Sequence, residues 1–178
     1  MDHRSLLLLG LLMSDSQHGY QIHDFVEKNL TFISNMKKAT AYSLLDKLSK
    51  EGLIDVSVEY DGNRPPRKVY SINESGRKQF YHLLEINLSA AENIFYEGDI
   101  GFMFLDQLPL DKSIEFLQKK HEMLREIYNT ITHLSIHECS SGVTIAMNHK
   151  KRMLEAELSF ITETIQQLNN HTIHQETE

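Results

Sequence analysis

The sequence has a single cysteine, Cys139, which excludes an intramolecular disulfide. Chains without disulfides are typical of reducing compartments, so we expect a cytoplasmic protein. Long apolar runs are also missing. The run Leu6 to Met13 is too short to span a bilayer, and it has neither a basic leader nor a small-residue cleavage site. We expect this run to form a buried helix.

Signatures of catalysis are missing as well. The sequence has no Gly-rich phosphate loop, no metalloprotease motif and no Ser or Cys nucleophile in a recognisable turn, so it predicts no enzyme and no cofactor. His133 and His137 are four residues apart, with Cys139 close by, which leaves a metal or redox sensor as an alternative. Ten histidines in a helix-rich chain produce such a pair by chance, and we therefore assign no metal ligand.

The chain has enough apolar residues for an ordinary core, and its charge is unevenly distributed. Of 178 residues, 40% are apolar and the net charge is −7. Residues 1–80 carry 11 Lys+Arg against 10 Asp+Glu, whereas residues 81–178 carry 7 against 15. The halves are thus +1 and −8, which predicts that any contact with a polyanion involves the first half.

The first half predicts three short helices. Arg4 to Ser14 is apolar nearly all round, and residues 19–29 show a mixed spacing of three and four. A third helix follows Ser34 or Asn35, either of which is a suitable N-cap. Its apolar residues share one face, and Gly52 is expected to end it in a left-handed conformation.

The apolar period then changes from 3.6 to 2, which indicates strands. Residues 53–60 alternate Ile54, Val56, Val58 and Tyr60 with polar residues, and residues 67–72 alternate less regularly. The intervening Asp-Gly-Asn-Arg-Pro-Pro segment is rich in turn residues, so the two strands are expected to form a β-hairpin. Asn73 is then a suitable N-cap for a helix that ends near Leu88.

Three helices followed by a basic-tipped hairpin indicate a winged helix-turn-helix. In that fold the third helix enters the major groove of DNA, and the hairpin contacts an adjacent groove or phosphates. The predicted fold class is therefore mainly α with a small β-hairpin wing. We expect a DNA-binding domain over residues 1–82 and an antiparallel helical domain over residues 83–178.

Several motifs of the first half resemble the PadR family of transcriptional regulators. LLLLGLLMSDSQHGYQI is similar to the family's first two helices, ATAYSLLDKLSKEGLI to its recognition helix, and PPRKVYSINESGRKQF to its wing and fourth helix. The resemblance covers about residues 3 to 82. Departures from the family pattern are Ala39 for glycine, Ala41 for leucine and Asn73 for threonine.

The candidate DNA-binding residues come from the predicted third helix, its N-terminus and the hairpin. The lysines and the wing cations are identified by their charge and position, and the resemblance implies that Lys38, Thr40, Tyr42 and Ser43 face DNA. The residue pattern leaves open whether Tyr42 contacts a phosphate or packs in the core. The full set is Asn35, Lys37, Lys38, Thr40, Tyr42, Ser43, Lys47, Asn63, Arg64, Arg67 and Lys68.

The second half predicts one short apolar helix from Asp99 to Leu108 and two long amphipathic helices, 111–135 and from 143 onward. Because a helix pair has more apolar surface than it can bury within itself, we expect a homodimer. The resemblance likewise implies a C-terminal helical dimerisation domain. The candidate dimerisation residues are Leu117, Leu124, Ile131, Leu154, Leu158, Ile161, Ile165 and Leu168.

These features together predict a repressor that binds a palindromic operator as a homodimer. The resemblance implies aromatic or hydrophobic effectors in some members, but the sequence identifies no effector-binding residue. Phe95, Tyr96, Phe102 and Phe104 are candidates for lining a pocket. The alternative is a winged helix that binds another protein and has only weak, sequence-independent affinity for DNA.

Overall fold

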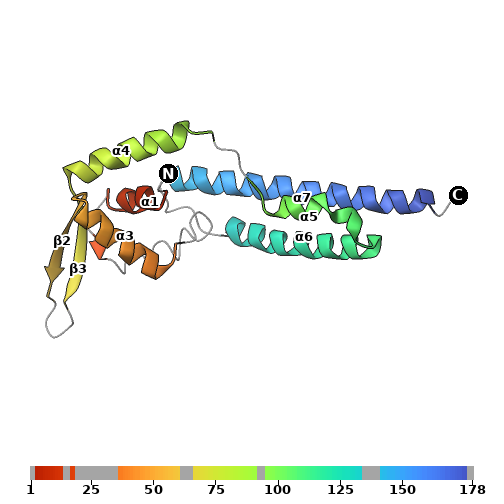
Figure 1. The fold of residues 1–178 in the computed structure, drawn as a ribbon, viewed down its shortest axis with the longest axis horizontal. Coiled ribbons are helices and arrows are strands. Elements are labelled where there is room, and N and C mark those ends of the chain that lie inside the picture. The colour runs from red at the N-terminus through yellow and green to blue at the C-terminus, as the bar shows by residue number, and fades with distance from the viewer. Residues whose placement is uncertain are drawn as a thin grey trace. The chain divides into compact units, whose positions relative to one another are not determined.

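The computed structural model describes residues 3–13, 17–18, 36–60, 66–91, 95–133 and 141–175, with backbone only for 17–18 and 171–175. The chain divides into two compact units, Met1–Glu92 and Asn93–Glu178, which are described separately (Figure 1). The described part is mainly helical with an antiparallel hairpin, as the sequence predicted. The predicted second helix, residues 19–29, and the hairpin tip, 61–65, lie outside the described residues.

The core of the first unit lies between helices α1 (His3–Leu11) and α3 (Lys38–Lys50) and one end of the hairpin. Leu8 and Leu9 of α1, Leu45 of α3 and Tyr70 of the hairpin are each at most 1% exposed. Burying a leucine side chain contributes about 1.5–3 kcal/mol, so this cluster fixes α3 on its apolar face and leaves the opposite face to solvent.

Helix α3 begins later than the sequence predicted. Its N-cap is Lys37, which has extended backbone and no side-chain cap hydrogen bond, so the prediction of Ser34 or Asn35 as N-cap is wrong. The first turn begins with the backbone hydrogen bond from Ala41 N–H to the Lys37 carbonyl at 3.0 Å, and Met36 and Ala41 are buried in the core beside it. The other end follows the prediction, because Gly52 has a φ of 71° just after the helix.

Strands β2 (Ile54–Glu59) and β3 (Arg67–Ile72) form the hairpin, and β1 (Gln17–His18) adds to the other edge of β3, giving the order β1-β3-β2. The register runs from Ile54 opposite Ile72 to Glu59 opposite Arg67. The alternation predicted for β2 holds only at its start. Ile54 is 2% exposed, whereas Val56 and Val58 are 38% and 49% exposed, because the hairpin extends beyond the helices of its unit (Figure 1).

Helix α4 (Glu74–Ser89) begins at a tightly connected junction. Asn73 is its N-cap, as predicted, and the side-chain oxygen of Asn73 accepts a hydrogen bond from Gly76 N–H at 3.0 Å. The amide nitrogen of the same side chain donates to the Gly52 carbonyl at 3.0 Å and to Asp55 Oδ1 at 3.3 Å. One side chain therefore links the ends of α3, β2 and α4.

The second unit consists of α5 (Gly98–Met103), the 3₁₀ turn η1 (Leu105–Gln107), α6 (Leu110–His133) and α7 (Ser141–Gln175). The single helix predicted from Asp99 to Leu108 is thus wrong, since the α-helix ends at Met103 and the chain tightens into η1. Helices α6 and α7 pack along each other as an antiparallel pair (Figure 1). Among the described helices, none is long and apolar enough to cross a membrane.

Candidate functional site

The N-terminal end of α3 presents two lysines to solvent. Lys37 and Lys38 are exposed, and within the described residues neither has an ion-pair partner. Lys37 is the N-cap of the helix and Lys38 is its first residue. Four backbone N–H groups at this end have no partner within the helix, so the positive end of the helix dipole adds to the charge of the two lysines. This end of α3 is therefore suited to a phosphate.

The other predicted contact residues of α3 differ in exposure. Ser43 and Lys47 are exposed, whereas Thr40 and Tyr42 are half-buried. Lys47 forms an ion pair with Glu51 at 3.8 Å. Tyr42 is half-buried, so part of its side chain remains accessible, and burial raises the pKa of the neighbouring core residue Tyr70.

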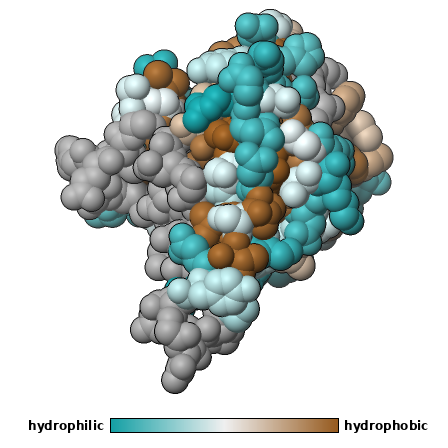
Figure 2. Space-filling view, turned by 90° about the vertical axis from the view of Figure 1, so that its left-hand side faces the viewer, coloured by the Kyte–Doolittle hydropathy of each residue, from teal (hydrophilic) through white to brown (hydrophobic). Residues whose placement is uncertain are grey.

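Two cations of β3 extend the basic surface. Arg67 is half-buried and Lys68 is exposed. Lys68 Nζ lies 3.2 Å from Asp46 Oδ1 on α3, and the hydrogen bond to Asp46 raises the pKa of Lys68. Strand β3 and helix α3 thus meet at an ion pair that sequence reasoning missed. The face in Figure 2, on the hairpin side of the view in Figure 1, carries hydrophilic side chains around a smaller group of apolar ones.

Three predicted DNA contacts cannot be placed. Asn35, Asn63 and Arg64 lie outside the described residues. The described candidates come from α3, the residue before it and the first half of β3, so the structure brings them to one unit, Met1–Glu92.

The predicted dimerisation residues lie largely inside the α6–α7 pair. Leu117, Ile131, Leu154 and Ile161 are at most 5% exposed within a single chain. Leu124, Leu158, Ile165 and Leu168 are half-buried. The 3 and 4 spacing therefore identified the face that each helix turns toward the other. Their packing is reinforced by Tyr128 O–H, which donates to Glu155 Oε1 at 2.7 Å.

A second apolar face of this pair remains uncovered. Phe116, Met123 and Ile127 of α6 are 51%, 58% and 38% exposed, and their intervals of seven and four residues place them on one face. On α7, Met153 and Phe160 are 37% and 49% exposed and are also seven residues apart. Exposed apolar surface of this extent is typical of an interaction site.

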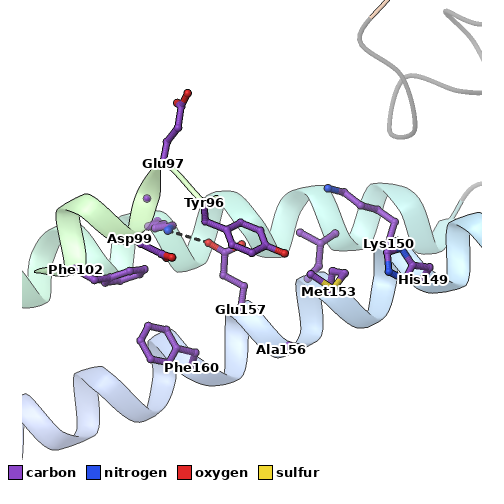
Figure 3. A pocket seen from close by; sticks show the side chains of 13 residues that line it. Tyr96, Glu97, Asp99, Phe102, His149, Lys150, Met153, Ala156, Glu157 and Phe160 are labelled. Atoms are coloured by element: carbon purple, nitrogen blue, oxygen red, sulfur yellow. Dashed lines mark ion pairs between the residues drawn. The ribbon is translucent and has the colours of Figure 1, made fainter. Parts of the chain in front are cut away.

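A cavity of about 580 Å³ lies between the start of α5 and helices α6 and α7 (Figure 3). The rings of Phe102 and Phe160 meet edge to face, 5.1 Å between centroids, and line its apolar part. Lys120 Nζ lies 4.5 Å from the Phe102 centroid and 2.8 Å from Glu157 Oε1. The complete lining is Tyr96, Glu97, Gly98, Asp99, Phe102, Lys120, His149, Lys150, Met153, Leu154, Ala156, Glu157 and Phe160.

The sequence predicted this pocket only in part. Tyr96 and Phe102 line it, whereas Phe95 and Phe104 do not. The missed residues include Glu97, Gly98 and Asp99 at the start of α5, and the others come from α6 and α7. An apolar wall with an ammonium group at one end is suited to a small molecule that has a flat apolar body and one polar end.

The predicted histidine pair has one described member. The Nδ1 atom of His133 lies 2.7 Å from the Asn129 carbonyl oxygen, which engages that nitrogen in the helix. His137 and Cys139 lie outside the described residues. Within the described part of the chain, no group of three or more metal-ligating side chains comes together.

A hairpin beside helix α3, with lysines at the start of that helix, defines a winged-helix DNA-binding unit, and the second unit adds a long helix pair. Residues 8–82 match the model of the family described as "Transcriptional regulator PadR-like family". The match covers the first unit of the chain, and it agrees with the family resemblance that the sequence motifs indicated. The family matched by this unit is one of transcriptional regulators.

Known relatives agree with this assignment. The chain is 24% identical over 124 residues to the negative transcriptional regulator PadR of Bacillus subtilis, covering 67% of this chain and 68% of the relative. The crystal structure of B. subtilis PadR in complex with operator DNA has a TM-score of 0.83 and 17% identity, covering 93% and 99% of the two chains. The structure of that protein with p-coumaric acid has a TM-score of 0.80 and 16% identity, covering 93% and 98%. At these identities the structural likeness shows the fold.

Proposed function

We propose that the protein is a repressor that binds a palindromic operator through α3 and the hairpin, in a cytoplasmic setting. The observation that carries the proposal is the pair of exposed lysines at the N-terminus of α3, next to a strand with two further cations. A helix that enters the major groove places its N-terminal residues at the base edges and phosphates. The proposal extends to Asn35, Asn63 and Arg64, which lie in the sequence just before α3 and between the two strands of the hairpin.

The contact roles divide by chemistry. Lys37, Lys38, Arg67 and Lys68 are proposed to contact phosphates, which gives affinity without sequence information. Thr40, Tyr42 and Ser43 are short or aromatic polar residues on the first turns of α3, and we propose that they contact base edges or phosphates directly. Lys47, which already pairs with Glu51, is proposed to have a minor role.

The substitutions Lys38→Ala and Arg67→Ala test the proposed interface. Each is expected to weaken binding to DNA from the region upstream of the protein's own gene by about tenfold at low salt and to reduce the salt slope by about 1. Mobility shifts at several salt concentrations measure both quantities. Lys78→Ala is the control, because Lys78 is an exposed lysine of α4 that pairs with Glu74.

The outcome separates two classes of protein. One protected palindromic site, lost in both variants but retained in Lys78→Ala, supports the repressor. Weak binding that ignores sequence and is unchanged by all three substitutions rejects it. That result would favour a winged helix that binds another protein.

We propose further that the protein acts as a homodimer formed through its second unit. The uncovered apolar residues of α6, Phe116, Met123 and Ile127, support a second copy as the occupant, because an isologous contact lets one face serve both chains. The buried residues predicted from the sequence then stabilise each helix pair from within. Two recognition helices about 34 Å apart match one turn of DNA, which is why the operator is expected to be palindromic. Sedimentation velocity measures the oligomeric state.

We also propose that a small aromatic molecule regulates DNA binding from the cavity between α5, α6 and α7. The observations that favour it are the facing rings of Phe102 and Phe160 and the ammonium group of Lys120 beside them. The relative in B. subtilis has been crystallised with p-coumaric acid, a molecule with a flat apolar body and a carboxylic acid. A ligand changes DNA affinity only by binding one conformation better than the other.

The substitution Phe160→Ala tests this site with p-coumaric acid as the probe. We expect calorimetry to show about two- to tenfold weaker binding than to the wild type, because one edge-to-face aromatic contact contributes about 0.5–1.5 kcal/mol. Phe104→Ala is the matched control, since Phe104 is exposed and does not line the cavity. Equal affinity in both variants would reject this cavity, and absence of binding to the wild type would reject this class of molecule.

A further inference from the structure

Asp46 is an acidic residue on the helix proposed to enter DNA. It lies on the solvent side of α3, between the buried Leu45 and the exposed Lys47, and its side chain is 53% exposed. Its carboxylate is 3.2 Å from the Nζ atom of Lys68 on β3. A carboxylate in this place repels DNA, so it is unfavourable for binding unless it has a specific role.

The fold does not depend on this ion pair. Both partners are more than half exposed, with side-chain exposures of 57% for Lys68 and 53% for Asp46, and exposed pairs contribute little to stability. The contact between α3 and the hairpin is formed instead by buried residues, among them Leu45, Leu48, Ile54 and Tyr70. Removing the carboxylate is therefore expected to leave the unit folded.

When DNA approaches, Asp46 and a DNA phosphate compete for the ammonium group of Lys68. Lys68 is proposed to contact a phosphate, and in the free protein its hydrogen bond goes to Asp46. A lysine released to a phosphate liberates a counterion from DNA, and this release supplies most of the affinity for DNA of any sequence. A lysine that stays with a carboxylate contributes less.

We infer that Asp46 restrains DNA binding by holding the ammonium group of Lys68, which lowers the electrostatic part of the affinity. The inference rests on the proposed role of α3 and β3 in DNA binding. Its effect falls on the electrostatic part of the affinity, which all DNA shares. The carboxylate thereby weakens the salt-dependent binding of every duplex, and random-sequence DNA measures this effect without an operator.

The substitution Asp46→Asn keeps the size of the side chain and removes its charge. We expect it to bind a random-sequence duplex roughly threefold or more tightly at low salt, with a salt slope steeper by about 0.9. Fluorescence anisotropy against salt concentration gives both values. Thermal unfolding is expected to be unchanged, which separates the electrostatic role from a structural one.

Two further variants show whether the effect passes through Lys68. The double variant Asp46→Asn/Lys68→Gln should lose the gain in affinity for random-sequence DNA. Lys68→Gln should also weaken binding less in the wild type than in the Asp46→Asn variant. Glu74→Gln is the matched control, because Glu74 is an exposed acid of α4 that pairs with Lys78 at 3.5 Å. It is expected to bind as the wild type does.

Three results would overturn the inference. Weaker binding by Asp46→Asn would show that the carboxylate positions Lys68 for DNA, and unchanged binding would show that it has no role. An equal gain in DNA affinity for Glu74→Gln would show that the effect comes from the net charge of the protein and not from Lys68. A random-sequence duplex needs no operator, so these results are independent of whether the wild type recognises one.

Discussion

Gly76→Ala is expected to destabilise the first unit strongly. Gly76 is buried in the first turn of α4, and a Cβ atom there would overlap the Leu53 carbonyl oxygen and crowd Ile72 Cγ1. The clash involves backbone, so neighbouring side chains cannot relieve it by rotating. Overpacking of this kind costs about 1–3 kcal/mol, and with no freedom to relax we expect the upper end.

Thermal unfolding of the protein measures the effect. A loss of about 3 kcal/mol corresponds to a fall in the midpoint of the first unit's transition of about 12–24 °C for a domain of this size. Gly101→Ala is the control, because a Cβ atom at Gly101 meets nothing within 4 Å. A wild-type midpoint for Gly76→Ala would mean that the start of α4 can move away from Leu53.

Met123→Glu/Ile127→Glu is expected to turn the proposed dimer into monomers. Both residues lie on the uncovered face of α6, and burying two carboxylates in an apolar contact without partners costs several kcal/mol. At about 1.4 kcal/mol for each factor of ten, the dimer dissociation constant should rise more than a hundredfold. Sedimentation velocity at a series of concentrations measures it.

The opposite flank of the same helix supplies the control. Gln118 and Asn129 are exposed and lie eleven residues apart, so Gln118→Glu/Asn129→Glu adds the same charge away from the apolar face. This variant should remain dimeric. If both double variants associate equally, the second copy binds elsewhere and the apolar face has another partner.

The sequence predicted those parts of the fold whose signals are local. Helix α3, its closing glycine and the Asn73 cap each depend on residues within a few positions of one another, and the structure bears them out apart from the start of α3. The start was missed because no side-chain hydrogen bond caps the helix, so the search for a polar N-cap residue did not identify Lys37.

Features that join distant segments could not be predicted. Asp46 and Lys68 are 22 residues apart, and their pairing follows from how the hairpin packs on α3. The cavity likewise joins Phe102 to Lys120 and Phe160 from two other helices. Apolar spacing also cannot distinguish a face that packs within one chain from one that a second copy covers, which is why Ile131 and Ile161 were assigned to the dimer.

The junction at Asn73 has a mechanical consequence. Its amide group joins the end of α3, the start of β2 and the first turn of α4, and Gly76 lies directly on Leu53. The chain continues from α4 into the second unit. The first turn of α4 is fixed to the end of α3 by these contacts. We therefore expect α4 and α3 to move together, and in the proposed dimer a change in the angle between the two α4 helices would change the distance between the two α3 helices.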